Sequence, residues 1–318
     1  MEDRLRQWCA MQLGLAAEQL APLEKVAGDA SFRRYFRARL RDGRSFILMD
    51  APPDKEDSRP FVDVAGRLLD GGVHAPAILA SDLQEGWLLL EDLGDELYKQ
   101  AFEQGDGATL MEPVFDVLER QAQLVSCEGL PAYDRGRLQS ELDLFPDWYL
   151  TRQRLQVFNP DEQALWQELC DRLCRSAGEQ PQVFVHRDFH SCNLMYLGDA
   201  APGVIDFQDA VRGPLSYDLM SILLDRYITW PRAQLEIWIE QFRLRVAPDC
   251  EPDQWLRWCD WMGLQRNLKI IGIFARLAHR DGKSGYLELI PRFADYVRDV
   301  LLRYKELQGY RSLLEHRL

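Results

Sequence analysis

The spacing of hydrophobic residues along the chain changes near residue 95. Before it, apolar residues alternate with polar ones or form short runs bounded by Gly, Pro and Asp, which predicts strands. Five such runs occupy residues 22–28, 31–40, 45–52, 76–82 and 86–94. Between the third and fourth runs, residues 59–71 have helical spacing and end at Gly71-Gly72, a typical helix stop. The first part therefore predicts a five-stranded sheet with one inserted helix.

After residue 96, apolar positions mostly follow the 3.6-residue period of helices. The segments with this period are 109–126, 139–156, 160–177, 216–228, 231–246, 252–278 and 284–308. Strand-like runs occur there only at 183–186, 194–197 and 203–207. The pattern predicts an α+β protein with two lobes, one of residues 1–93 and a second, mainly helical, of residues 94–318.

Composition and charge restrict the possible partners. A net charge of −13 over 318 residues argues against nucleic acid as a main partner, because a phosphate backbone needs a basic surface. No apolar run is long enough to span a bilayer, and the amphipathic N-terminus lacks the features of a signal peptide. Seven scattered cysteines without a CxxC pair are typical of reduced thiols. We therefore expect a cytoplasmic protein with a small-molecule ligand.

Polar residues at the strand-like runs of 183–207 have the spacing of kinase-type phosphoryl transfer. Asp188 is followed by Asn193 five positions later, and Asp206 comes directly after an apolar run. Asp188 is the candidate catalytic base, which receives the proton of the attacking hydroxyl. Asn193 and Asp206 are candidate ligands of the Mg²⁺ that accompanies ATP. Each alone is an ordinary loop or turn residue, but the combined spacing favours a site.

Nucleotide contacts are predicted in two further places. Gly28, Asp29, Ala30 and Ser31 lie between the first two strands, where backbone N–H groups can cover phosphates, although any hairpin turn looks similar. Arg33 and Arg34 can add positive charge, or can belong to a solvated strand face, and we take Arg34 as the candidate. Glu91 and Leu93 follow the fifth run and form the candidate adenine-binding hinge, with a simple loop as the alternative.

The stretches HRDFHSCNL and IDFQDA resemble the aminoglycoside phosphotransferase and choline kinase branch of the kinase-like fold. Residues 28–37, 47–53, 88–95, 183–224 and 265–277 look closer still to its bacterial anomeric amino-sugar kinases. This resemblance implies a bilobal protein-kinase-like fold and ATP- and Mg²⁺-dependent phosphorylation of the C1 hydroxyl of N-acetylmuramate and N-acetylglucosamine. It also implies a role in UDP-sugar formation during peptidoglycan recycling, which bypasses the steps that fosfomycin blocks.

Under this resemblance, six residues are candidate sugar contacts. They are Arg187, His190, Asp209, Arg266, Asn267 and Lys269. His190 can instead stabilise its loop, and the last three can instead form a solvated helix face.

One departure from kinases concerns the third strand. Met49 stands where a kinase would place a phosphate-binding Lys, and Asp63 is the nearest carboxylate in the inserted helix. How the chain holds the phosphates is therefore open. An aminoglycoside or small-alcohol (choline-type) phosphotransferase is the alternative function, and a non-catalytic scaffold of the same fold is a third hypothesis.

Overall fold

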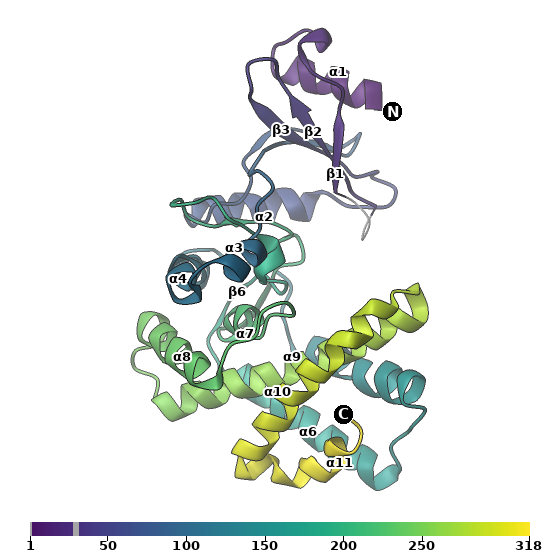
Figure 1. Cartoon of the computed structure of the whole chain (residues 1–318), viewed down its shortest axis with the longest axis vertical. Helices are drawn as coiled ribbons and strands as arrows, with labels where there is room; N and C mark the ends of the chain where they lie inside the picture. Colours follow the sequence, from purple (N-terminus) through teal and green to yellow (C-terminus); the bar gives the residue numbers. More distant parts are fainter. Residues whose placement is uncertain (1, 28–31) are drawn as a thin grey trace. The chain divides into compact units, whose positions relative to one another are not determined.

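The computed structural model describes residues 2–27 and 32–318. The predicted phosphate-covering residues Gly28, Asp29, Ala30 and Ser31 lie outside this part. The chain forms two compact units, which Figure 1 shows in the colours of the sequence. Unit 1 comprises Met1–Val125 and Cys192–Asp209, and unit 2 comprises Ser126–Ser191 and Ala210–Leu318. Unit 1 therefore contains helices that follow the predicted lobe boundary at residues 93 and 94.

Unit 1 contains the predicted five-stranded sheet. Its strands are β1 (Glu24–Ala27), β2 (Arg34–Arg39), β3 (Ser45–Asp50), β4 (Ile78–Asp82) and β5 (Trp87–Glu91). All neighbours are antiparallel, in the order β1-β2-β3-β5-β4. The inserted helix α2 (Arg59–Asp70) has Pro60 in its first turn and ends at Gly71, as its sequence predicts.

The two faces of this sheet have different surroundings. Helix α1 (Glu2–Gln12) covers one face, where Leu5 and Trp8 pack with Phe36 and Leu48 (Figure 1). The other face lines a cavity of unit 1. Burial of the apolar side chains between α1 and the sheet stabilises the strands that support this cavity.

The rest of unit 1 brings the candidate metal ligands to one place. It consists of helices α3 (Tyr98–Gln104) and α4 (Gly107–Gln123) and the hairpin of β7 (Leu194–Met195) and β8 (Gly203–Val204). Asn193 precedes β7 and Asp206 follows β8, so antiparallel pairing places them at the same end of the hairpin. The backbone N–H of Val204 donates to the His74 carbonyl (2.8 Å), which ties the hairpin to the segment before β4.

Unit 2 is mainly helical. Its elements include α5 (Arg135–Leu142), α6 (Pro160–Glu179), β6 (Gln182–Val185), β9 (Val211–Pro214), α7 (Tyr217–Leu223), α8 (Arg232–Val246), α9 (Pro252–Asp281), α10 (Ile290–Arg303) and α11 (Arg311–Glu315). Helix α9 packs against α6, α7, α8 and α10 (Figure 1). A Cβ on Gly272 of α9 would lie 2.4 Å from the backbone of Leu144, so glycine permits this close approach.

Three predictions for this part were wrong in detail. Residues 139–156 form the end of α5 and a π-helical segment (Phe145–Gln153), with Pro146 at its start, instead of one helix. Residues 284–308 contain short 3₁₀ turns on both sides of α10. Strand β9 pairs antiparallel with β6 and has no counterpart in the sequence analysis. Its sequence, VRGP, lacks a run of apolar or alternating residues.

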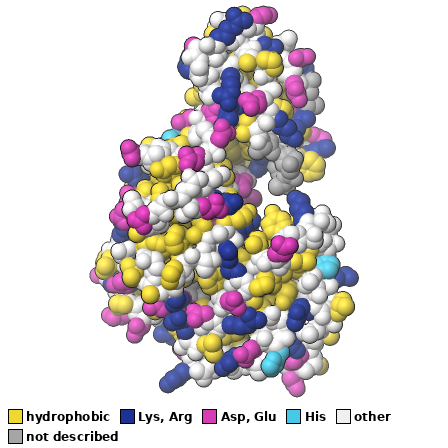
Figure 2. All heavy atoms as spheres, viewed as in Figure 1, with side chains coloured by type: hydrophobic (Ala, Val, Ile, Leu, Met, Phe, Trp, Pro, Cys, Tyr) yellow, Lys and Arg dark blue, Asp and Glu magenta, His cyan; other side chains and the backbone are white. Residues whose placement is uncertain are grey.

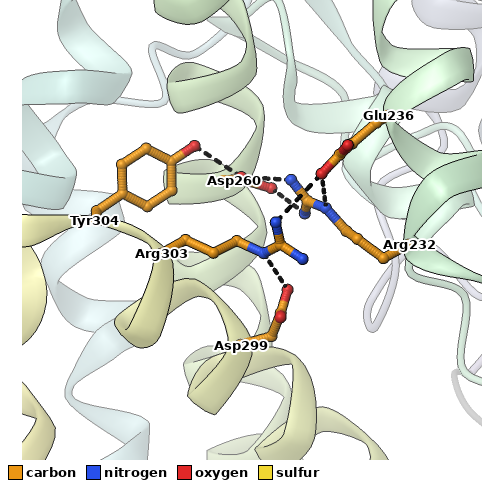
Figure 3. Close-up of polar contacts among 6 residues, drawn as sticks. All are labelled: Arg232, Glu236, Asp260, Asp299, Arg303 and Tyr304. Atoms are coloured by element: carbon orange, nitrogen blue, oxygen red, sulfur yellow. Dashed lines mark hydrogen bonds and ion pairs between the residues drawn. The ribbon is translucent and has the colours of Figure 1, made fainter.

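A network of ion pairs joins three helices of unit 2 (Figure 3). The guanidinium of Arg232 in α8 donates two bonds to Asp260 in α9, at 2.6 and 2.8 Å, and Asp260 is only 1% exposed. Tyr304, which follows α10, also donates to Asp260 (2.7 Å). Glu236 of α8 accepts from Arg232 (2.7 Å) and contacts Arg303 of α10 at 3.3 Å. The network therefore connects α8, α9 and α10.

Basic and acidic side chains are interspersed on the face of the molecule that Figure 2 shows. Among the described residues, no helix is both long enough and apolar enough to cross a membrane.

Candidate active site

Two carboxylates of unit 2 hold the backbone of the loop that carries Asp188. The Asp218 carboxylate of α7 accepts the backbone N–H groups of His186 (2.6 Å) and Arg187 (3.1 Å). Asp225 accepts the N–H of Ser191 (2.8 Å). Arg187 has a φ of 77°, which is uncommon for a residue with a side chain. The loop therefore has a fixed and locally strained conformation.

Lys269 keeps the candidate base ionised. Burial, the largest single influence, opposes the charge of Asp188, but the nearby positive groups, with Lys269 the strongest of them, together outweigh burial, and the pKa of Asp188 lies below its usual range. Asp188 is therefore a carboxylate at neutral pH and can accept a proton. Sequence reasoning placed Lys269 among the sugar contacts and did not predict this effect.

A second carboxylate balances the cations around the loop. Glu141 of α5 contacts the Lys269 ammonium and the Arg187 guanidinium, both at 2.9 Å. Lys269 also donates to the Tyr217 hydroxyl (3.0 Å), and Tyr133 donates to Glu141. Paired charges of opposite sign reduce the cost of burying this cluster. Glu141 was not predicted, because nothing near it in the sequence marks it as a site residue.

His190 is neutral in this environment. Burial and the positive charge of Arg226 lower the pKa of His190 to about 3. The Arg226 guanidinium contacts Nε2 of His190. Because a guanidinium can only donate, Nε2 must accept, and the imidazole proton is on Nδ1. Arg226 is a second residue that the sequence did not reveal.

The three candidate contacts on α9 are buried, so the solvated-face alternative is wrong. Their exposed fractions are 6% for Arg266, 0% for Asn267 and 9% for Lys269. Arg266 donates to the Ser221 hydroxyl (2.6 Å) and to the Met220 carbonyl (3.3 Å).

The candidate metal ligands lie together in unit 1. Nδ2 of Asn193 is 3.4 Å from Oδ2 of Asp206, and Gln208 donates to Oδ1 of Asp206 (2.9 Å). Asp206 is exposed and has a φ of 63°, so its backbone is also strained. One carboxylate and one amide are donors that suit Mg²⁺, which usually takes one or two carboxylates from protein and completes its shell with phosphates and waters. A half-turn of the amide brings its oxygen to the position of Nδ2.

The candidate metal ligands and the predicted hinge line one cavity of about 480 Å³ in unit 1. Its wall includes Glu91, Leu93, Asn193 and Asp206, together with Tyr35 and Arg37 of β2. A cavity of this size is in the range of small-molecule sites. The structure therefore brings the two predicted nucleotide contacts of the hinge, Glu91 and Leu93, to the same cavity as the two candidate metal ligands.

Arg37 fixes the hinge, although the sequence did not predict it. Its buried guanidinium bonds to Asp92 at 2.7 and 3.0 Å, to Asp95 at 2.9 Å and to the Gly94 carbonyl at 3.1 Å. The Glu91 carboxylate accepts the Ala77 N–H (3.2 Å) and contacts His74 (3.1 Å). These bonds hold the segment that follows β5.

Two candidates lie elsewhere. Arg34 of β2 is opposite Asp50 of β3 and forms an ion pair with it. Asp209 is exposed in unit 1.

Solved structures identify the class of fold. The chain is similar to a choline/ethanolamine kinase family protein from Mesorhizobium loti (TM-score 0.64, 16% identity, 99% of each chain). It is also similar to a Plasmodium vivax ethanolamine kinase (TM-score 0.63, 11% identity, 93% of this chain and 85% of the other). An ADP-bound aminoglycoside phosphotransferase gives a TM-score of 0.61 at 12% identity, over 94% of this chain and 97% of the other. The fold is that of the kinase-like phosphotransferases.

The family is shown by sequence. A model of the phosphotransferase enzyme family matches residues 22–256, and the chain belongs to this family. Relatives named N-acetylmuramate/N-acetylglucosamine kinase occur in Pseudomonas aeruginosa (46% identity, 92% of this chain and 88% of the relative) and Neisseria meningitidis serogroup B (43%, 91% and 88%). The chain is therefore a kinase-type enzyme.

Proposed function

We propose that this protein is an ATP- and Mg²⁺-dependent kinase that phosphorylates the C1 hydroxyl of N-acetylmuramate and N-acetylglucosamine. The observation that carries the proposal is the similarity, over about nine tenths of the chain, to relatives named for these two sugars. The ionised carboxylate of Asp188 and the cavity with Asn193 and Asp206 supply the chemistry that such a reaction needs.

Asp188 is the proposed proton acceptor. As the C1 oxygen forms its bond to the γ-phosphorus, the bond from that phosphorus to the β,γ-bridging oxygen breaks, and ADP leaves. The hydroxyl proton passes to the Asp188 carboxylate. A hemiacetal hydroxyl is more acidic than an ordinary alcohol, so a carboxylate base is adequate.

The proposed metal ligands are Asn193 and Asp206. Mg²⁺, when bound with the nucleotide, would neutralise the negative charge of the phosphates. The Arg37 bonds hold the hinge residues in place, so that backbone groups near Glu91 and Leu93 can bind the adenine edge.

The proposed sugar contacts are those of the sequence analysis, Arg187, His190, Asp209, Arg266, Asn267 and Lys269. Arg187 keeps 25% of its side chain exposed, so it is the best placed of the basic residues to meet a ligand from solution. A lactyl carboxylate, present in N-acetylmuramate, favours such a basic neighbour.

The product would be a sugar 1-phosphate, the form from which UDP-sugars are made. We propose that it feeds peptidoglycan recycling and supports growth when fosfomycin blocks early cell-wall synthesis. The use of ATP and the presence of seven free cysteines favour a cytoplasmic location.

A substrate screen tests this function. Purified protein with ATP and Mg²⁺ is given N-acetylmuramate, N-acetylglucosamine, choline or an aminoglycoside, and ADP formation is measured. We expect turnover with the two amino sugars and none above background with Asp188→Asn. A strong preference for choline or an aminoglycoside would instead establish the alternative phosphotransferase function.

A further inference from the structure

The third strand, β3, has no positively charged side chain that could bind nucleotide phosphates. In protein kinases, a Lys of this strand contacts the phosphates and forms an ion pair with a Glu of the following helix. Met49 occupies the matching position of β3, and its side chain is fully buried. Asp63 of α2 is bonded to Arg67 in the same helix (2.8 Å). A phosphate-binding cation must therefore come from another position.

The alternation of side chains in β2 points to Arg33. Successive residues of a strand face opposite sides of the sheet. Tyr35 and Arg37 line the cavity, whereas Phe36 packs in the core under α1. Arg34 shares the face of Phe36, and its guanidinium contacts a carboxylate of β3. Arg33 directly precedes the strand, two residues before Tyr35 and four before Arg37. Continuing the alternation of the strand by one residue therefore places the Arg33 side chain on the cavity face of the sheet.

Arg33 is buried and has a carboxylate partner. Its exposed fraction is 8%, and its NH2 lies 3.4 Å from Oε2 of Glu56, which precedes α2. Oε1 of Glu56 accepts the backbone N–H of Phe32, also at 3.4 Å. Both distances exceed the 2.7–2.9 Å typical of a tight charge-assisted bond.

The charges of both Arg33 and the candidate metal ligand Asp206 act on the hydroxyl of Tyr35. Burial raises the pKa of Tyr35 to about 12, and the charges of Arg33, Asp206 and Glu56 all act on the same hydroxyl. Tyr35 and Asp206 line the same cavity. The charges of Arg33 and Asp206 thus both act on Tyr35, a residue of the cavity wall.

We propose that Arg33 binds the nucleotide phosphates, with Glu56 as its counter-ion, in place of the absent strand-three Lys. This inference rests on the proposed use of ATP. A guanidinium is always protonated and presents paired N–H groups that match two phosphate oxygens. The Arg33–Glu56 pair would then take the role of the Lys–Glu pair of protein kinases. Its two residues lie directly before β2 and shortly before α2.

Nucleotide binding to the full-length protein tests the proposal. Affinities for ATP, ADP and adenosine are measured by calorimetry with Mg²⁺ for wild type, Arg33→Met and Arg33→Lys. Arg39→Met is the matched control, because it removes an exposed charge of the same strand, whose ion pair with Glu24 lies at the surface. Arg33→Met should bind ATP and ADP about tenfold or more weakly, the scale of a hydrogen bond to a charged group. Its affinity for adenosine should stay within about twofold of wild type.

Arg33→Lys should recover most of the lost ATP affinity, and Arg39→Met should stay within about twofold for all three ligands. If Arg33→Met does not fold, Arg33→Gln replaces it. This variant also lacks the charge and should show the same loss of ATP and ADP affinity. Unchanged ATP affinity in a folded charge-free variant, or equal losses for ATP and adenosine, would overturn the proposal. Wild type that binds ATP but phosphorylates no amino sugar would refute the proposed function and leave this inference standing.

Discussion

Asp188 and Asp206 are eighteen positions apart and have opposite environments. Asp188 is surrounded by buried cations and is ionised because of them, whereas Asp206 is exposed and faces an amide. A buried carboxylate with a compensating cation suits proton transfer, and an exposed one suits a hydrated metal ion. The two proposed roles are therefore supported by local electrostatics as well as by the motif.

Replacing Asp188 by Asn should lower kcat by at least ~10²-fold, because the amide cannot take the hydroxyl proton. The Michaelis constant for ATP should change little, since the cavity of unit 1 is untouched. Steady-state kinetics and circular dichroism measure both. Near-normal turnover in the folded variant would remove Asp188 from the role of base.

Replacing Lys269 by Met should move the acid limb of the pH profile of kcat to higher pH. The Lys269 charge lowers the pKa of Asp188, so its removal raises that pKa, and the active carboxylate is lost earlier as pH falls. The Lys269→Met variant also carries Glu141→Gln, so that the carboxylate of Glu141 is not left buried without Lys269. Lys283→Met, which removes an exposed lysine charge, is the control. An unmoved acid limb would show that Lys269 does not act on the base.

Site residues that could be predicted from the sequence lie close together along the chain, whereas those that could not be predicted contact residues far away in the sequence. Asp188, Asn193 and Asp206 lie within one short stretch, so their spacing alone marks them as candidates. Glu141 is 46 positions from the Arg187 that it contacts, and Arg37 is 55 positions from Asp92. Such pairs are created by folding, and no periodicity or short motif in a single sequence encodes them.

Elements were predictable where one face of the element is apolar. Helix α2 and the sheet of unit 1 have clear periods, and their predicted bounds agree with the structure to within a few residues. Strand β9 and the π-helical segment lack such a signal, because tertiary contacts decide their conformation. Ion pairs between helices were likewise invisible in the sequence, although they join α8, α9 and α10.

Replacing Asp260 by Asn should lower the free energy of unfolding by about 3 kcal/mol, the cost of breaking a buried ion pair. Asp260 is 1% exposed and accepts two bonds from Arg232. The matched control is Asp295→Asn, since the Asp295 side chain is 75% exposed in its pair with Arg298 and should contribute less than about 1 kcal/mol. Urea unfolding measures both, and equal effects would contradict a special role for the buried pair.

On the scale of the whole molecule, the family match identifies the class of enzyme, and the proposed substrate rests on the names of the sequence relatives. Structures at 11–16% identity share the fold while their names refer to ethanolamine, choline or aminoglycosides. One fold thus supports several acceptors, and the acceptor has to be argued from the site. The net charge of −13 is a global property and does not locate a pocket.

The central claim is phosphorylation at C1, and the methyl glycoside of N-acetylglucosamine tests it most directly. This compound retains every hydroxyl of the sugar except the reacting one. The protein, with ATP and Mg²⁺, is incubated with each compound, and phosphorus NMR identifies the position of any phosphate. We predict a 1-phosphate from N-acetylglucosamine and N-acetylmuramate and no product from the glycoside. A phosphorylated methyl glycoside, with its phosphate on C6 for example, would contradict the assignment.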